Sequence, residues 1–370
     1  MAALNDLPKR ARGRSAQGKT QAVLIHNNKG TSLMRRFLIA GLAAAILSSP
    51  LATLSAQADE IRPRMIRFGY GLNEDSNQGR AAKLLAEEVA KASGGKLKLR
   101  TFGAASLGAD NQMQNALIGG AQEMMVGSTA TLVGISKEMA VWDTPFLFSS
   151  EQQADAVLDG PLGRQVMDKL EEKGLVGLVY WENGFRNMTN NVRPITKLEE
   201  FSGIKLRVMP NPVFLETFKL MGANAVPLPF SELFTALETK AVDGQENPYN
   251  TILSSKFYEV QKYLTVTNHV YSPWIVTASK RWWDGLSQTE QDIIMQAAIK
   301  ARDFERQDTR AEAAKALEQL QANGMQVNQI SAEETQRMRD KAQPAIQQVI
   351  DTVGQELFDQ VQAEAAKAAN

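Results

Sequence analysis

One arginine stands where a predicted strand ends, a position at which a side chain can meet a ligand. The segment GIKLRVMPNP, residues 203–212, alternates as a strand, with Arg207 on the face opposite Leu206 and Pro210 ending the pattern. A helix is predicted to follow, and in open α/β sheets ligands bind where strands end and helices begin. Because a guanidinium presents a fork of N–H donors that matches a carboxylate, Arg207 is a candidate anchor for an organic anion.

A second arginine, Arg186, shortly follows the long apolar segment at residues 174–184. Arginines at two strand ends are a local exception, because the chain after its first 58 residues is acidic. The two could form one anion-binding site, or each could form a structural salt bridge with Glu182 or Glu199. The residue types alone leave both interpretations open.

The segment AVDGQENPYN, residues 241–250, gathers amide and carboxylate groups before a proline. Pro248 suits the first turn of a helix, which would place Gln245, Glu246 and Asn247 at a helix N-terminus. Free N–H groups and the helix dipole favour an anion at such a terminus, and simple capping is the alternative.

Aromatic residues occur close to these segments in the sequence: Tyr180, Trp181, Phe185, Phe230, Tyr249, Tyr271 and Trp274. Packing in the core or in a pocket wall is expected for most of them, and stacking on a ligand for one or two. Trp181 and Tyr271 are the predicted ligand contacts among them.

The composition argues against several classes of function. The chain has no cysteine, and only one of its two histidines, His269, follows residue 58. Thiolate metal sites, cysteine nucleophiles and histidine-rich zinc sites are therefore excluded, and no metal or cofactor is expected. After residue 58 the chain carries 33 Lys and Arg and 40 Asp and Glu, a formal charge of −7, which argues against a nucleic-acid partner.

The N-terminal segment has the pattern of an export signal. The residues MRR at 34–36 precede eleven apolar residues, 37–47, and AQA ending at Ala58 is a small-x-small cleavage site. Eleven residues are too few to span a bilayer, which needs about 20, so a short membrane anchor is the lesser alternative. Residues 34–58 are predicted to be a signal peptide cleaved near Ala58, and residues 1–33 a leader or a mis-assigned start.

Strand and helix patterns follow one another along the rest of the chain as β-α-β-α-β, and this order occurs in two regions. It predicts an α/β fold of two lobes with a ligand cleft between them. The first strand is expected at residues 65–72, and Asp110 is expected to cap the short helix at 109–120. The predicted lobes are 59–184 with about 273–310, and 185–272 with about 311–370.

One uninterrupted helical pattern follows the second region. Residues 287–323 contain no proline or glycine and begin with a capping box, Ser287 with Glu290. A single helix of about 36 residues would be about 54 Å long. We predict one helix that spans both lobes, because helix-forming residues continue throughout, and two helices with a break are the alternative.

Several blocks of the sequence resemble one family. GFRNMTNN, LEEFSGIKLRVMPN, VDGQENP and KFYEVQKYLTVTNHVY occur in the order typical of the solute-binding subunits of tripartite ATP-independent periplasmic (TRAP) transporters, the DctP family. The resemblance covers about residues 64–355. It implies a periplasmic binding protein fold of two lobes that close over an organic acid, and delivery of that acid to a TRAP membrane permease.

The resemblance also implies roles for single residues. Arg207 would pair with the ligand carboxylate, and Arg186 would assist it. Further ligand contacts are implied for Asn247, Phe230, Ser128, and Asn73 or Asn77. Sialic-acid-binding members tend to carry an acid and an arginine where Ser128 and Thr131 stand, so a C4-dicarboxylate, a keto acid or a sugar acid is expected instead. The alternatives are a receptor that passes its ligand to a signalling partner and, less favoured, a secreted enzyme.

Overall fold

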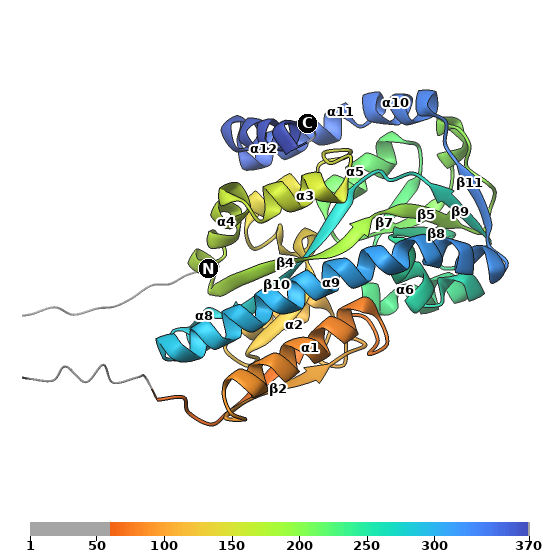
Figure 1. Cartoon of the computed structure of the whole chain (residues 1–370). Helices are drawn as coiled ribbons and strands as arrows, with labels where there is room; N and C mark the ends of the chain where they lie inside the picture. The colour runs from red at the N-terminus through yellow and green to blue at the C-terminus, as the bar shows by residue number, and fades with distance from the viewer. Residues whose placement is uncertain (1–59, 369–370) are drawn as a thin grey trace, which may run out of the picture. The chain divides into compact units, whose positions relative to one another are not determined.

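Two β-sheets form the framework of the chain, and helices pack against both (Figure 1). The structure, a computed structural model, describes residues 60–368. The predicted leader at 1–33 and the predicted signal peptide at 34–58 therefore lie outside the described residues. Within residues 60–368, no helix is both long enough and apolar enough to cross a membrane.

The first sheet has five strands, in the order β2 (Leu97–Phe102), β1 (Arg64–Gly69), β3 (Met124–Ser128), β10 (Tyr271–Ser279) and β4 (Leu175–Phe185). β1 is parallel to β2 and β3, whereas β10 is antiparallel to β3 and β4. The sequence predicts the first strand at residues 65–72, but the strand ends at Gly69 and the chain bends at residues 71–72. This bend directs the following loop toward the other sheet.

The second sheet has six strands, in the order β11 (Gln326–Gln329), β9 (Tyr263–Val266), β5 (Asn187–Asn190), β8 (Gly244–Asn247), β6 (Lys205–Val208) and β7 (Asn224–Pro227). Residues 244–247 form the strand β8, so the prediction that they lie at a helix N-terminus holds only for Asn247, which directly precedes the N-cap of the next helix. Pro248 is the N-cap of the short helix α7 (Tyr249–Ser254), which has no side-chain cap, so the capping alternative is wrong.

Two short connections and one long helix carry the chain between the sheets. Arg186 joins β4 to β5, and residues 267–270 join β9 to β10. The helix α9 (Gln288–Ala322) packs on β4 and on α1 (Asn77–Ala92) beside the first sheet, and on α7 beside the second (Figure 1). Its 35 residues are about 52 Å long. The prediction of one unbroken helix with a Ser287–Glu290 capping box is confirmed.

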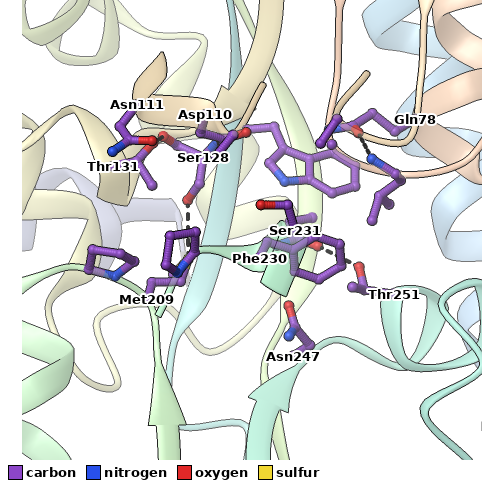
Figure 2. A pocket seen from close by; sticks show the side chains of 18 of the residues that line it. Gln78, Asp110, Asn111, Ser128, Thr131, Met209, Phe230, Ser231, Asn247 and Thr251 are labelled. Atoms are coloured by element: carbon purple, nitrogen blue, oxygen red, sulfur yellow. Dashed lines mark hydrogen bonds between the residues drawn. The ribbon is translucent and has the colours of Figure 1, made fainter. Parts of the chain in front are cut away.

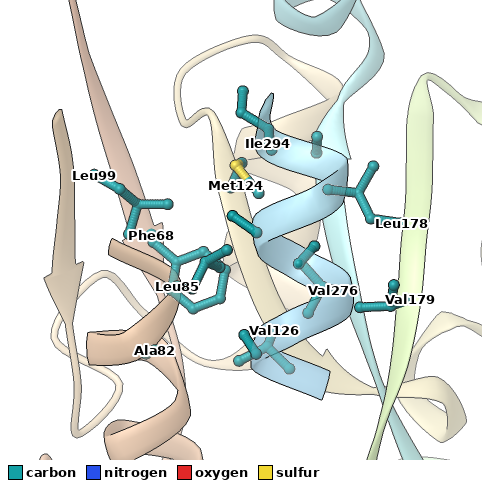
Figure 3. Close-up of a cluster of buried hydrophobic side chains, with 14 of the residues drawn as sticks. Phe68, Ala82, Leu85, Leu99, Met124, Val126, Leu178, Val179, Val276 and Ile294 are labelled. Atoms are coloured by element: carbon teal, nitrogen blue, oxygen red, sulfur yellow. The ribbon is translucent and has the colours of Figure 1, made fainter. Parts of the chain in front are cut away.

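A hydrophobic core fixes the first sheet against α1 and α9 (Figure 3). Phe68, Val126 and Val276 come from three neighbouring strands, and Leu85 and Ile294 come from the two helices. All five side chains are fully buried. Burial of each is worth about 1.5–3 kcal/mol, so the strand ends that this core supports are held firmly in place.

The remaining helices are α2 (Asp110–Ile118), α3 (Glu151–Leu158), α4 (Pro161–Asp168), α5 (Pro212–Leu220), α6 (Leu233–Glu238), α8 (Lys280–Trp283), α10 (Ala332–Lys341), α11 (Gln343–Val353) and α12 (Gln355–Ala368). α12 packs against α3 (Figure 1), and α11 packs against the 3₁₀ segment Lys137–Asp143. The predicted second-lobe segment 311–370 thus has contacts beside both sheets, and the lobe boundaries stay a prediction.

Candidate functional site

A cavity of about 250 Å³ lies between strand ends of the two sheets. The first sheet and its connections contribute Gln78, Asp110, Asn111, Ser128, Thr131, Asn183 and Trp274. The second sheet and its connections contribute Arg207, Met209, Phe230, Ser231, Asn247 and Thr251, and Arg186 lies where the chain crosses between the sheets. Figure 2 shows Asp110, Ser128 and Thr131 on one side of the cavity and Met209, Phe230 and Asn247 on the other. Apolar walls with a few polar groups are typical of small-molecule sites.

Arg207 reaches this cavity because its neighbours in β6 face the other way. Leu206 and Val208 are fully buried in a cluster with Phe214 and Phe218 of α5. Since side chains alternate along a strand, Arg207 turns away from that cluster. The strand pattern thus places a guanidinium, 1% exposed, in the cavity lining.

The guanidinium of Arg207 makes one hydrogen bond and no salt bridge within the part of the chain that the structure describes. Its Nε donates to the carbonyl oxygen of Leu228 at 2.8 Å, and its Nη1 has no hydrogen-bond partner. No acidic side chain among residues 60–368 lies within ion-pair distance of it. Burial lowers the pKa of Arg207 to about 10, so the group still carries its charge at neutral pH. A buried cation that faces a cavity without a partner is suited to an anion.

Arg186 differs, because it forms a salt bridge with Glu246. The two side chains are fully buried, and Arg186 donates to both carboxylate oxygens, from Nη2 to Oε1 at 2.8 Å. The salt-bridge interpretation therefore holds for Arg186 with a different partner, since Glu182 and Glu199 pair with other arginines. Nη2 also donates to Oδ1 of Asn247 at 3.2 Å, so Arg186 positions a cavity residue.

Glu246 holds a histidine as well. Nε2 of His269 lies 3.1 Å from Oε2 of Glu246, and Nδ1 lies 2.8 Å from the hydroxyl of Thr267. Burial raises the pKa of Glu246, but the charges and hydrogen bonds of Arg186 and His269 together outweigh it, so the net pKa is lowered. Burial lowers the pKa of His269, so its imidazole is neutral at pH 7. His269 lies between two strands, fully buried, and does not line the cavity.

Asp110 brings a carboxylate into the cavity lining. It is the first residue of α2 rather than its N-cap, and the predicted capping role is wrong. The cap position is Ala109, whose N–H donates to Oε1 of Gln112 at 2.8 Å. Asp110 is therefore free to accept from the N–H of Ser128, at 3.0 Å from Oδ2. Burial raises the pKa of Asp110 overall, and the N–H of Ser128 and the charge of Arg207 offset only part of this increase.

The structure brings five of the nine predicted site residues together around the cavity: Arg207, Arg186, Asn247, Phe230 and Ser128. Four others, Asn73, Asn77, Trp181 and Tyr271, do not line it.

The two asparagines have partners elsewhere. Nδ2 of Asn73 donates to the carbonyl oxygen of Ser254 at 2.7 Å. Nδ2 of Asn77 donates to the hydroxyl of Thr309 at 2.8 Å, because the first turn of α1 faces α9. The aromatic pair packs in the core. Trp181 lies against Phe68, and the hydroxyl of Tyr271 donates to Glu182 at 3.2 Å.

Several residues that line the cavity are not predicted from the sequence, and the structure shows why. Gln78 follows Asn77 in α1, and one helical step turns a side chain by about 100°, so the neighbour reaches the cavity instead. Trp274 is three residues from Tyr271 in β10, so alternation along the strand puts their side chains on opposite faces. Tyr271 packs in one cluster with Ile275, and Trp274 packs in the other with Val276 and lines the cavity. Which face of β10 meets the cavity depends on its pairing with β3 and β4, which the sequence of β10 alone does not reveal.

Comparisons with known proteins point to one family. The family model of bacterial extracellular solute-binding proteins, family 7 (DctP), matches residues 68–352. The 2,3-diketo-L-gulonate-binding periplasmic protein YiaO of Escherichia coli (strain K12) is 36% identical over 296 residues, which are 80% of this chain and 87% of that protein.

Two crystal structures with bound acids are similar over most of this chain. The sugar acid binding protein DctPAm of Advenella mimigardefordensis strain DPN7T, in complex with galactonate, is 51% identical with a TM-score of 0.82, covering 84% of this chain and 100% of that one. A TRAP periplasmic solute binding protein from Polaromonas sp. JS666, bound to D-erythronate, is 37% identical with a TM-score of 0.78, covering 81% of this chain and 98% of that one.

Proposed function

This chain belongs to the bacterial extracellular solute-binding proteins of family 7, and from that premise we propose that it captures a sugar acid in the cavity between its two sheets. Arg207 binds the carboxylate, and Arg186 and Asn247 complete that end of the site. The two lobes close over the acid, and differential contact with both lobes shifts the open–closed equilibrium. The protein works in the periplasm, after cleavage near Ala58, and delivers the acid to a TRAP permease.

The observation that supports this proposal best is the unpaired charge of Arg207. Removing an ion from water costs several kcal/mol, which a partner of opposite charge offsets. Arg186 has such a partner in Glu246, and Arg207 has none among the described residues. A carboxylate that enters the cavity supplies the missing charge and two acceptor oxygens.

The far side of the cavity favours a sugar acid over a C4-dicarboxylate or a simple keto acid. Asp110, Ser128 and Thr131 offer acceptors and hydroxyls, the groups that bind ligand hydroxyls. A second ligand carboxylate would lie near the carboxylate of Asp110 and be repelled by it. Galactonate and D-erythronate, bound by the two similar crystal structures, each combine one carboxylate with several hydroxyls.

Galactonate is expected to stabilise the mature protein, residues 59–370, against thermal unfolding. At 100 times its Kd a ligand adds about 2.7 kcal/mol to the free energy of unfolding. Galactitol, which lacks the carboxylate, and galactarate, which carries a second one, are matched controls that should give little or no shift. An equal shift with galactitol would contradict the role of Arg207. Lack of any shift with aldonates, together with no acid released on unfolding, would contradict the proposed function.

Replacing Asp110 with asparagine should change which acid the protein prefers. The amide keeps an acceptor for the N–H of Ser128 but removes the negative charge. The ratio of galactarate to galactonate affinity should rise about tenfold, since a like-charge repulsion of about 1–2 kcal/mol is lost at an effective dielectric constant of about 20. Isothermal titration calorimetry measures both affinities. Asp292→Asn, at an exposed position of α9 outside the cavity, is the control, and an unchanged ratio in Asp110→Asn contradicts the prediction.

A further inference from the structure

The helix α7 is held by hydrogen bonds from elements beside the first sheet, although it follows a strand of the second sheet. Asn73, in the loop after β1, donates from Nδ2 to the carbonyl oxygen of Ser254 at 2.7 Å. The hydroxyl of Thr251 donates to Oδ1 of Asn183, in β4, at 3.0 Å. Both bonds therefore join the two sides of the cavity.

The position of α7 is directly connected to the site. Only Pro248 separates α7 from Asn247, and Thr251 itself lines the cavity. Proline restricts the backbone between them, so a displacement of α7 is transmitted to Asn247. Gly184 lies against Pro248, with 3.6 Å between a Cβ built on Gly184 and Cβ of Pro248. This contact brings the end of β4 close to the start of α7.

The loop that carries Asn73 is itself well supported. The backbone carbonyl oxygen of Asn73 accepts from the hydroxyl of Ser76 at 2.6 Å and from the N–H of Ser76 at 3.3 Å. Gly79 of α1 lies so close below the loop that a Cβ there would be 2.4 Å from the carbonyl oxygen of Glu74. The donor of Asn73 is therefore presented from a fixed backbone, and little freedom is lost when the bond forms.

We propose that Asn73 is a positioning residue, whose bond to Ser254 holds α7, and with it Asn247, in the ligand-bound arrangement. The inference rests on the proposed function, in which the two sides of the cavity separate to release the ligand. The bond between Asn73 and Ser254 joins the two sides, so it breaks when they separate. It therefore slows dissociation of the ligand and leaves association largely unchanged.

The test compares Asn73→Ala with wild type by stopped-flow fluorescence, with galactonate as the probe. One neutral hydrogen bond corresponds to a change of about three- to tenfold, so the dissociation rate should rise by that factor while the association rate stays constant. Asn323→Ala is the matched control, because Asn323 is exposed and also donates to a backbone carbonyl, that of Gln319, at 2.8 Å. Asn73→Gln keeps the donor and should restore part of the loss.

A second measurement needs no ligand and separates this inference from the proposed function. Hydrogen exchange at the amides of Ile252 and Ser255, which close the helical bonds of α7, should be faster in Asn73→Ala than in Asn323→Ala. Equal exchange in the two variants overturns the inference. So does an equal galactonate dissociation rate in the two. If wild type binds no aldonate but exchange at α7 still differs, the proposed function fails while the contact from Asn73 to α7 stands.

Discussion

Arg207→Ala is expected to weaken the binding of galactonate by about 100- to 10,000-fold. Two charge-assisted hydrogen bonds to a carboxylate are worth about 1.5–3 kcal/mol each, and alanine removes both. The free energy of unfolding of the ligand-free protein should not fall, because the substitution removes a buried cation that has no partner. Loss of binding together with retained stability separates a ligand anchor from a structural arginine.

Titration calorimetry measures the affinity, and urea unfolding without ligand measures the stability. Arg193→Ala is the control, since Arg193 is half-buried, donates to the carbonyl oxygen of Glu200 at 3.0 Å and does not line the cavity. Its affinity for galactonate should equal that of wild type. Arg207→Lys keeps the charge without the planar fork, so its affinity for galactonate should lie between those of wild type and Arg207→Ala. Wild-type affinity in Arg207→Ala would show that the carboxylate is bound elsewhere.

Arg207 and Arg186 differ in how much of their surroundings could be predicted from neighbouring residues in the sequence. Arg207 could be placed at a strand end that lines the cavity, because alternation with Leu206 and Val208 and the prolines that follow depend only on neighbouring residues. The partner of Arg186 could not be identified in this way, since Glu246 is 60 residues away in the sequence and meets it through the pairing of β5 with β8. Pairing between distant strands is set by the whole fold.

The same distinction applies to helices. The length of α9 follows from an uninterrupted run of helix-forming residues and one capping box, so it could be predicted. Which of Asn77 and Gln78 reaches the cavity depends on where α1 begins and on how it rotates against α9. A rotation of one residue exchanges their roles. Site residues on helix ends are therefore less predictable than the helices that carry them.

The two guanidinium groups of the site differ in whether their charge has a partner in the protein. The charge of Arg186 is balanced by Glu246, and one of its N–H groups donates to Asn247. Arg186 therefore positions a residue of the cavity wall. Arg207 has no ion-pair partner among residues 60–368, and its Nη1 has no hydrogen-bond partner. Under the proposed function, one ligand carboxylate would balance this one charge. This charge balance agrees with a monocarboxylate ligand and with the carboxylate of Asp110 on the far side of the cavity.

Glu246→Gln is expected to lower the free energy of unfolding at pH 7 by about 3–5 kcal/mol. The glutamine keeps the volume and an acceptor oxygen, but it leaves Arg186 as an uncompensated charge in the interior. Such a loss is a large part of a typical stability of about 5–15 kcal/mol. Urea unfolding gives the difference directly, provided that the slope with denaturant is the same in both proteins.

Glu199→Gln is the matched control, because Glu199 also pairs with an arginine, Arg337, but at the surface, with side chains 58% and 41% exposed. It should cost less than about 1 kcal/mol. The pKa of Glu246 is lowered in the folded protein, so its contribution is complete above the ordinary carboxyl pKa of about 4.3 and is lost as pH falls through the lowered value. The difference between wild type and Glu246→Gln should therefore shrink below about pH 4. Equal costs for the two variants at pH 7, or a difference that grows with acid, would mean that burial of the Arg186–Glu246 pair does not govern its contribution.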